Sequence, residues 1–95
     1  MELQFEWDEK KANLNFQKHR ITFEEAKTVF RDPLAYIFDD QWHSSNEQRE
    51  IIIGHDQKHR LILVCFTDRK QRIRIISARL ATKKERRDYE QHIQS

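Results

Sequence analysis

Apolar and polar residues alternate over residues 3–7, which is the pattern of a short strand with one face buried. The period then lengthens to that of a helix, because Ala12, Phe16 and His19 follow one another at spacings of four and three residues. An aspartate just ahead of this stretch can cap its first turn. The pattern therefore predicts a short strand followed by a helix over residues 9–18.

A second helix is indicated by Thr22 and Glu25, which have the spacing of a capping box. Apolar residues recur behind the box with helical spacing. Pro33, the single proline, disfavours helical geometry in the residue before it. We therefore expect this helix to cover residues 23–31.

Beyond the proline the pattern changes to that of strands separated by turns. Four strands are predicted, at residues 34–38, 49–54, 60–67 and 72–80. The third is apolar on both faces, as expected of a central strand. A second capping box, from Thr82 to Glu85, opens a final helix. An N-terminal strand, two helices, hairpin-connected strands and a C-terminal helix predict an α+β fold with a mostly antiparallel sheet, in one domain spanning residues 1–95.

Composition places the chain among folded, highly charged small proteins. Of its residues 37% are hydrophobic and 36% are charged, and the hydrophobic ones gather in runs, which argues against disorder. The single cysteine, Cys65, excludes a disulfide within the chain and is expected to act as a small buried hydrophobe. No stretch has the apolar length of a signal core or a membrane span. We therefore expect a cytoplasmic protein that makes no contact with membranes.

Positive charge is concentrated in the last third of the sequence. Residues 69–87 hold nine Lys or Arg and one acid, a net charge of +8, whereas the other residues hold nine basic and fifteen acidic side chains, a net charge of −6. A concentrated basic surface is typical of proteins that bind polyanions, most often nucleic acids.

Several short motifs are spread over nearly the whole chain. They are residues 5–8, Lys18 and His19, residues 21–26, Asp32 and Pro33, Gly54, residues 74–79, Thr82, Glu85 and Arg86, and Tyr89. Together they resemble the BrnT family of bacterial toxins, and residues 74–79 are the most specific part. The resemblance implies a RelE-like fold and activity as a ribonuclease in a type II toxin–antitoxin module. It also implies a neighbouring antitoxin that silences this protein, and a complex that represses its operon through the DNA-binding part of the antitoxin.

One position departs from the family pattern. The family usually has glycine after the Lys-His pair, where the first helix ends, and this chain has Arg20. Helices often end in a left-handed residue, a conformation that glycine adopts without steric cost. We expect Arg20 to adopt it with about 1 kcal/mol of strain, or the turn to differ.

Cleavage of RNA without a metal ion needs a base for the 2′-hydroxyl proton, cations for the charge that develops on the phosphate, and an acid for the leaving oxygen. Arg74 and Arg79 are the candidate catalytic cations and Arg72 is a candidate RNA-binding one, because arginine binds phosphate oxygens in pairs. Strict alternation would place Arg79 on the face opposite the other two, so we expect a bulge or an edge position in this strand. The alternative is that these arginines are solvated or pair with Glu47, Glu50 and Asp68.

His19 and Glu50 are the candidate catalytic residues for proton transfer. His19 ends the predicted first helix and titrates near neutrality, so it suits a base or an acid; the alternative is a cation that stabilises the helix end. Glu50 precedes an apolar strand and is a candidate base, with a structural ion pair as the alternative.

Further residues are candidates for binding RNA by charge or by stacking. The basic ones are Lys10, Lys11, Lys83 and Arg86, and the aromatic ones are Trp42 and Tyr89. Simpler alternatives exist for several of them. These are a solvated face for Lys10 and Lys11, docking against the sheet for Tyr89, and contact with the core edge or a partner protein for Trp42.

No cofactor or metal site is predicted. His55 and His59 flank a turn between strands and lack a third ligand nearby, so the spacing that binds metal on a helix does not apply. Gly54 is the only glycine, which excludes a glycine-rich phosphate loop. Two other functions stay open: a module that binds RNA or a partner without cutting, and a DNA-binding regulator, for which the second predicted helix is poorly suited.

Overall fold

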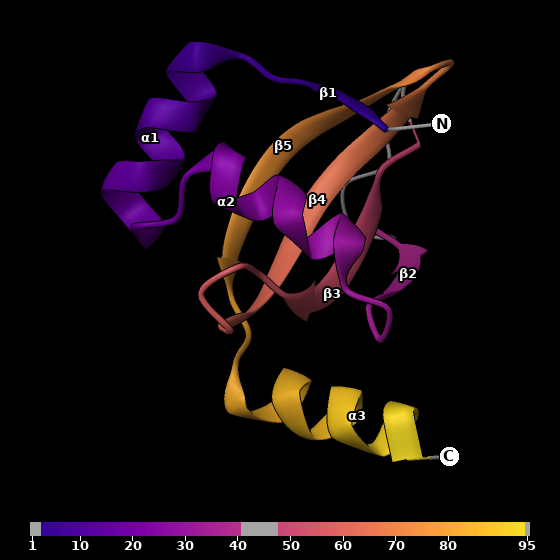
Figure 1. The fold of residues 1–95 in the computed structure, drawn as a ribbon. Coiled ribbons are helices and arrows are strands. Elements are labelled where there is room, and N and C mark those ends of the chain that lie inside the picture. The colour runs from indigo at the N-terminus through magenta and orange to yellow at the C-terminus, as the bar shows by residue number, and fades with distance from the viewer. Residues whose placement is uncertain (1–2, 41–47, 95) are drawn as a thin grey trace.

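A five-stranded sheet organises the part of the chain that the computed structural model describes, residues 3–40 and 48–94 (Figure 1). Its strands are β1 (Gln4–Glu6), β2 (Tyr36–Asp39), β3 (Glu50–His55), β4 (Leu61–Arg69) and β5 (Arg72–Leu80). The helices are α1 (Glu9–His19), α2 (Phe23–Lys27), the 3-10 helix η1 (Thr28–Arg31) and α3 (Lys83–Gln94). No helix among these residues is long and apolar enough to cross a membrane.

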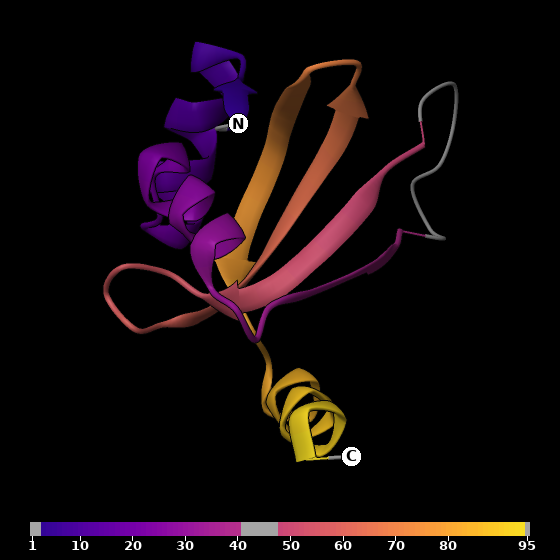
Figure 2. The same ribbon diagram turned by 45° about the vertical axis from the view of Figure 1, so that its right-hand side comes forward.

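The strands are arranged in the order β1-β5-β4-β3-β2. Three of the neighbouring pairs are antiparallel and β1 with β5 is parallel, so the predicted α+β class with a mostly antiparallel sheet is confirmed. β4 lies in the middle, as its two apolar faces indicated. Figure 2 shows α1, α2 and η1 gathered on one side of the sheet and α3 beyond the end of β5.

The second helix changes type partway along. α2 ends at Lys27 and the chain continues as η1, where a single α-helix over residues 23–31 was expected. The Thr28 hydroxyl donates to the Glu25 carbonyl at 2.6 Å and so competes with the backbone for that acceptor. The turn tightens and ends at Asp32, whose backbone is extended before Pro33.

The main hydrophobic core lies between the sheet and the layer of α1, α2 and η1. Even-numbered residues of β4, Ile62, Val64 and Phe66, face this core, so the odd-numbered ones face the other side of the sheet. The helical layer contributes Ile21, Phe23, Ala26 and Val29. On the other side of the sheet, a smaller core joins α3 to the strands through Ile53, Leu61, Leu63 and Tyr89. One face of the sheet is therefore covered by α1, α2 and η1, and the other face is covered by α3 alone among the described helices.

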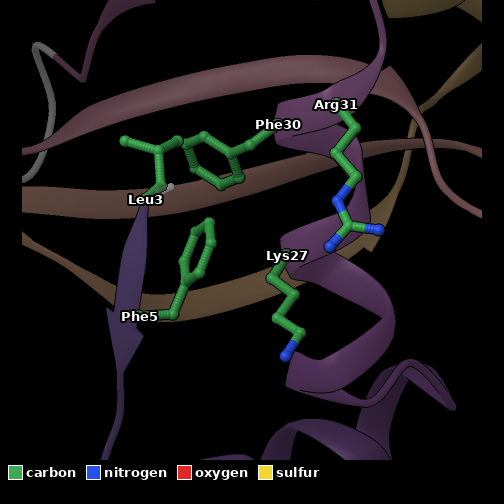
Figure 3. A pocket seen from close by; sticks show the side chains of 5 residues that line it. All are labelled: Leu3, Phe5, Lys27, Phe30 and Arg31. Atoms are coloured by element: carbon green, nitrogen blue, oxygen red, sulfur yellow. The ribbon is translucent and has the colours of Figure 1, made fainter. Parts of the chain in front are cut away.

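A pocket opens on the helical side of the sheet, between β1 and the helices α2 and η1 (Figure 3). It has a volume of about 420 Å³ and is lined by Leu3, Phe5, Lys27, Phe30 and Arg31. Phe5 pairs with Ile73, a residue of the main core, so the pocket belongs to the helical face. None of the candidate catalytic or RNA-binding residues lines it.

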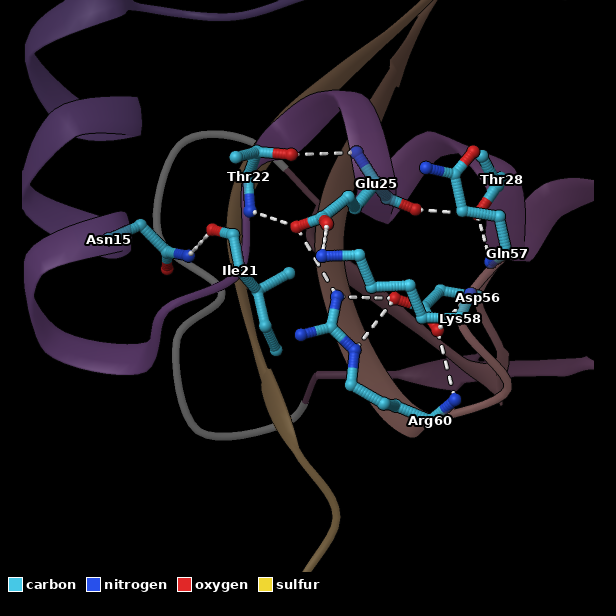
Figure 4. Close-up of polar contacts among 9 residues, drawn as sticks. All are labelled: Asn15, Ile21, Thr22, Glu25, Thr28, Asp56, Gln57, Lys58 and Arg60. Carbon is cyan, nitrogen blue, oxygen red and sulfur yellow. Dashed lines mark hydrogen bonds and ion pairs between the residues drawn. The ribbon is translucent and has the colours of Figure 1, made fainter.

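A polar network ties the start of α2 to the turn between β3 and β4 (Figure 4). Thr22 and Glu25 form the predicted capping box, with Glu25 N donating to Thr22 Oγ1 at 3.0 Å and Thr22 N donating to Glu25 Oε1 at 2.9 Å. The buried Glu25 carboxylate also pairs with Lys58 at 2.7 Å and Arg60 at 3.3 Å. The bond from Lys58 is the largest cause that lowers the pKa of Glu25 to about 2, so the carboxylate stays ionised near neutral pH.

Asn15 holds α1 against the edge of β5. Its side-chain nitrogen donates to the Ile21 carbonyl at 3.1 Å, and its side-chain oxygen accepts from Ala78 N at 3.0 Å. Asn15 is buried, so it satisfies two backbone groups that water does not reach. The contact keeps the C-terminal end of α1, and with it His19, beside β5.

Arg20 ends α1 in the left-handed conformation, with φ 59° and ψ 31°, so that expectation is confirmed. Its backbone nitrogen donates to the Phe16 carbonyl at 2.8 Å. Its guanidinium carbon lies 5.5 Å from the centroid of the Phe16 ring, within the range of a cation–π contact. The side chain therefore recovers part of the strain of its backbone.

Replacing Arg20 by glycine is expected to change the free energy of unfolding by less than about 0.5 kcal/mol. Glycine removes the strain of about 1 kcal/mol but also removes the cation–π contact, worth about 0.5–1 kcal/mol at an exposed site. Arg20→Ala, the matched control, keeps the strain and loses the contact, so it should be less stable than Arg20→Gly by about 1 kcal/mol. Urea unfolding of the three proteins measures this order. Equal stability of the glycine and alanine variants would show that the backbone at residue 20 is unstrained.

Candidate functional site

An irregularity in β5 brings the candidate arginines to one face of the sheet. Ile75 pairs with Phe66 and Ser77 pairs with Cys65, so Ile76 has no partner on β4. The strand therefore contains a β-bulge, and that alternative of the sequence-based expectation is confirmed. One inserted residue reverses the alternation of side chains beyond it.

The bulge aligns residues on its two sides. Arg74 pairs with Thr67 before the bulge, and Arg79 pairs with Leu63 after it. Thr67 and Leu63 both point away from the main core, because they are odd-numbered residues of β4. Arg74 and Arg79 therefore share this side of the sheet, as does Arg72 two residues before Arg74. We call it the arginine face. Without the bulge, Arg79 would point into the main core.

The arginine face and the first turn of α3 enclose a groove of about 480 Å³. Its apolar lining residues are Phe38, Ile51, Leu63 and Ile76. Its polar lining residues are Asp40, Arg49, Cys65, Ser77, Arg79 and Glu85. Apolar side chains together with arginines can accept a nucleobase and its phosphate, because the base offers a flat apolar surface and the phosphate a charge.

Arg79 forms an ion pair with Glu85 at the start of α3. Its terminal nitrogens Nη1 and Nη2 each donate to one carboxylate oxygen at 2.8 Å. Thr82 N also donates to this carboxylate, at 2.9 Å, and Glu85 N donates to the Thr82 hydroxyl, so the second predicted capping box is confirmed. The bonds from Arg79 are the largest cause that lowers the pKa of Glu85 to about 2, and the same bonds raise the pKa of Arg79.

Glu6 of β1 is the acidic partner of the other two arginines. It accepts from Arg74 Nη1 at 2.9 Å, and its carboxylate lies 4.0 Å from Arg72 Nη1. Glu50, one of the acids expected to pair with them, points to the opposite side of the sheet, because it pairs with Phe66 of the main core. Pairing with acids, which the sequence left open as an alternative, is thus present, but the acids that take part are Glu6 and Glu85, which the sequence did not suggest.

His19 lies at the end of α1, close enough to Arg79 to sense its charge. Burial is the largest cause that lowers the pKa of His19, and the positive charges of Lys18 and Arg79 lower it further. At neutral pH the imidazole is therefore uncharged and able to accept a proton. The charge of Arg79 therefore reaches the imidazole, although His19 belongs to α1 in the helical layer and Arg79 to the arginine face of β5.

Two other candidates do not lie where their suggested roles need them. Glu50 is separated from the arginines by the sheet itself. The Tyr89 ring is 2% exposed, stacks on Tyr36 with ring centroids 5.9 Å apart and meets His55 edge-on at 5.7 Å. RNA stacking on Tyr89 is therefore corrected: the ring is buried and docks α3 against the sheet.

The remaining basic candidates are exposed and lie at two places. Lys10 and Lys11 occupy the first turn of α1, roughly 12–14 Å along the helix from His19. Lys83 and Arg86 occupy the first turn of α3, next to the groove. Outside the described residues lie Trp42 and Glu47.

Two residues of the groove, Arg49 and Asp40, were not singled out in the sequence. Arg49 lies two residues before Ile51, so alternation along β3 would have placed it on the arginine face. Asp40 is buried and accepts a hydrogen bond from Cys65 Sγ at 3.6 Å, a contact that only the folded sheet reveals. Burial, and then the negative charge of Asp40, raise the pKa of Cys65 to about 11, so the thiol stays protonated. Over residues 3–40 and 48–94, no group of three or more His, Cys, Asp or Glu side chains is arranged to hold a metal ion.

Comparison with known proteins agrees with the motifs in the sequence. The family described as "Ribonuclease toxin, BrnT, of type II toxin-antitoxin system" matches residues 7–85. The chain belongs to the BrnT family. The matched residues include the whole of β5 and extend to Glu85, so the bulge and the ion pair lie inside the BrnT domain. No curated protein sequence matches the chain.

A crystal structure with the same fold is that of the Brucella abortus ribonuclease toxin, BrnT. It superposes with a TM-score of 0.66 over 86% of this chain and 100% of that one, at 24% sequence identity. At this identity the likeness concerns the fold, and the roles of individual residues rest on the geometry of this BrnT chain.

Proposed function

We propose that this chain is an endoribonuclease that cleaves RNA without a metal ion. Its family supports ribonuclease activity. The bulge at Ile76 supports particular residues, because it gathers Arg72, Arg74 and Arg79 on the face that carries the groove. Such a set of arginines suits a phosphate whose negative charge grows during reaction. We infer that the fold is RelE-like, as the family resemblance implies.

In the proposed reaction the 2′-oxygen of one nucleotide attacks its own 3′-phosphorus, and the bond to the 5′-oxygen of the next nucleotide breaks. His19 takes the proton of the 2′-hydroxyl, since its lowered pKa leaves it neutral. Arg74 and Arg79 bind the phosphate oxygens. The products are a 2′,3′-cyclic phosphate and a 5′-hydroxyl, whose oxygen takes a proton from solvent water, to which His19 returns the proton that it accepted. Glu50 takes no part, because its side chain is on the other side of the sheet.

The path of the RNA is proposed to follow the exposed basic residues. Lys83 and Arg86 flank the groove and Arg72 extends it along β5. Lys10 and Lys11 widen the positive surface at the start of α1. Contacts of this kind bind the RNA backbone through charge and carry little sequence preference.

An antitoxin partner follows from membership of a type II toxin–antitoxin family. We propose that this antitoxin neutralises the chain by binding it, and that operator DNA is reached only through the antitoxin in the complex. The length of α2, five residues, supports this division of roles, because a recognition helix in the major groove needs more turns.

A module that binds RNA without cutting it is the second candidate, and one observation favours it. Arg74 and Arg79 are both paired within the chain, with Glu6 and Glu85. Pairing of this kind lowers the positive potential that a catalytic clamp would offer a phosphate.

Purified protein is expected to cut single-stranded RNA in the presence of EDTA and to leave 2′,3′-cyclic phosphate ends. The same RNA with 2′-O-methyl groups should be bound and stay intact, because it lacks the nucleophile. Gel electrophoresis of end-labelled RNA measures both. Cutting that requires added Mg²⁺ would contradict the metal-free reaction. Binding of unmodified RNA without any cutting would establish the second candidate.

A further inference from the structure

The guanidinium of Arg79 is occupied by a carboxylate of the same chain. Both terminal nitrogens donate to Glu85 at 2.8 Å, and Nη1 also donates to the Leu80 carbonyl at 3.2 Å. The same two nitrogens would bind a pair of phosphate oxygens. A phosphate therefore cannot take this side of the guanidinium while the carboxylate holds it.

We propose that Glu85 competes with the substrate phosphate for Arg79, so that RNA enters the groove by displacing an internal carboxylate. The inference rests on the proposed function, which assigns Arg79 to the phosphate. Glu85 is then a positioning residue: it orients the Arg79 guanidinium at the empty groove and lowers the affinity for RNA.

The charge pattern of the segment supports this exchange. Glu85 is the single acid among the ten charged residues of positions 69–87. Its neighbours in the first turn of α3, Lys83 and Arg86, are exposed cations. The one negative charge of a basic segment thus lies on the arginine of β5 that lines the groove. With a pKa of about 2, the carboxylate is ionised throughout the physiological range, so a change of pH does not release it.

Glu85 also takes part in the capping box of α3, so its carboxylate can leave Arg79 while the N-terminus of the helix stays capped. Thr82 N donates to its carboxylate at 2.9 Å, and Glu85 N donates to Thr82 Oγ1 at 3.1 Å. The pair with Arg79 is also within reach of solvent, since the two side chains are 41% and 29% exposed. Water and phosphate compete well for exposed pairs of this kind.

Glu85→Gln tests the exchange, because glutamine keeps the capping box and removes the charge. Affinity is measured by fluorescence anisotropy with a short, mixed-sequence RNA that is 2′-O-methylated and therefore not cut. Glu85→Gln is expected to bind it about two- to fivefold more tightly than the wild type. Asp88→Asn is the matched control: it removes one negative charge from the same helix, at a residue that pairs with Lys84. Its effect on affinity should be clearly smaller.

Three further readouts separate competition from a structural role. The slope of log affinity against log salt should be steeper in Glu85→Gln, by up to about 0.7. In the wild type, the displaced Glu85 carboxylate takes up a salt cation and so offsets one of the cations that the RNA releases. Glutamine takes up none. On RNA that can be cut, KM should fall by the factor measured for affinity while kcat is unchanged. In the wild type, the NMR signal of the Glu85 carboxyl carbon should shift when RNA is added, and that of Asp88 should not.

Equal or weaker binding by Glu85→Gln would overturn the competition, as would an equal gain in Asp88→Asn or an unmoved Glu85 signal. A collapse of kcat would overturn it too, by showing that Glu85 takes part in the chemistry. Failure of the proposed function looks different, because the wild type would then leave unmodified RNA uncut, whatever Glu85→Gln does to the affinity.

Discussion

Arg79→Ala and Arg74→Ala are each expected to abolish growth arrest on expression and to slow RNA cleavage by about 10²–10³-fold. Each substitution removes donors aimed at the phosphate oxygens, where negative charge grows in the transition state, at a cost of about 2.7–4 kcal/mol. The free energy of unfolding should fall by no more than about 1 kcal/mol, because the ion pairs with Glu6 and Glu85 are open to solvent. Single-turnover cleavage and thermal unfolding measure the two effects.

Two controls accompany this prediction. Arg79→Lys keeps the charge and loses the paired donors, so it should restore little of the rate. Arg31→Ala removes an exposed arginine of η1 on the helical side of the sheet and should cleave RNA at the wild-type rate. If both Arg74→Ala and Arg79→Ala cleave at the wild-type rate, the arginine face is not the catalytic surface.

Gly54→Ala is expected to lower the free energy of unfolding by about 1–3 kcal/mol. A methyl group at this position of β3 would lie 2.6 Å from Ala35 Cβ, 3.0 Å from Asp32 Oδ2 and 3.1 Å from Val29 Cγ1. Ala35 Cβ is attached directly to the backbone, so η1 and the following turn would have to move away from β3. That movement would also lengthen the bond from His55 N to Asp32 Oδ2, now 2.8 Å.

Ala35→Gly provides the matched control, because it removes the methyl group that the new one would meet. The double variant Gly54→Ala with Ala35→Gly should recover part of the lost stability, and urea unfolding of the four proteins measures the coupling. Unfolding of Gly54→Ala at the wild-type urea concentration would show that β3 and the turn can separate at no cost.

The sequence correctly predicted the contacts between residues that are close together along the chain. Thr22 with Glu25 and Thr82 with Glu85 form capping boxes, because three residues of helix bring each pair together whatever the rest of the chain does. The left-handed backbone of Arg20 follows from the same kind of local geometry. The bulge in β5 was also foreseeable, since arginines occur at both even and odd positions of an otherwise apolar strand.

Contacts between distant segments decided which side chains share a surface. Glu6 meets Arg74 across 68 positions of sequence, because β1 pairs in parallel with β5. The register with β4 turns Glu50 away from the arginine face, and the docking of α3 on the smaller core buries Tyr89. The sequence by itself determined the order of the helices and strands and their approximate bounds, because these depend mostly on neighbours along the chain. Only the tertiary structure decided which arginines face the groove and which acids hold them. In a sheet, the register between strands sets the neighbours of each side chain, and one inserted residue reverses the face on which they lie.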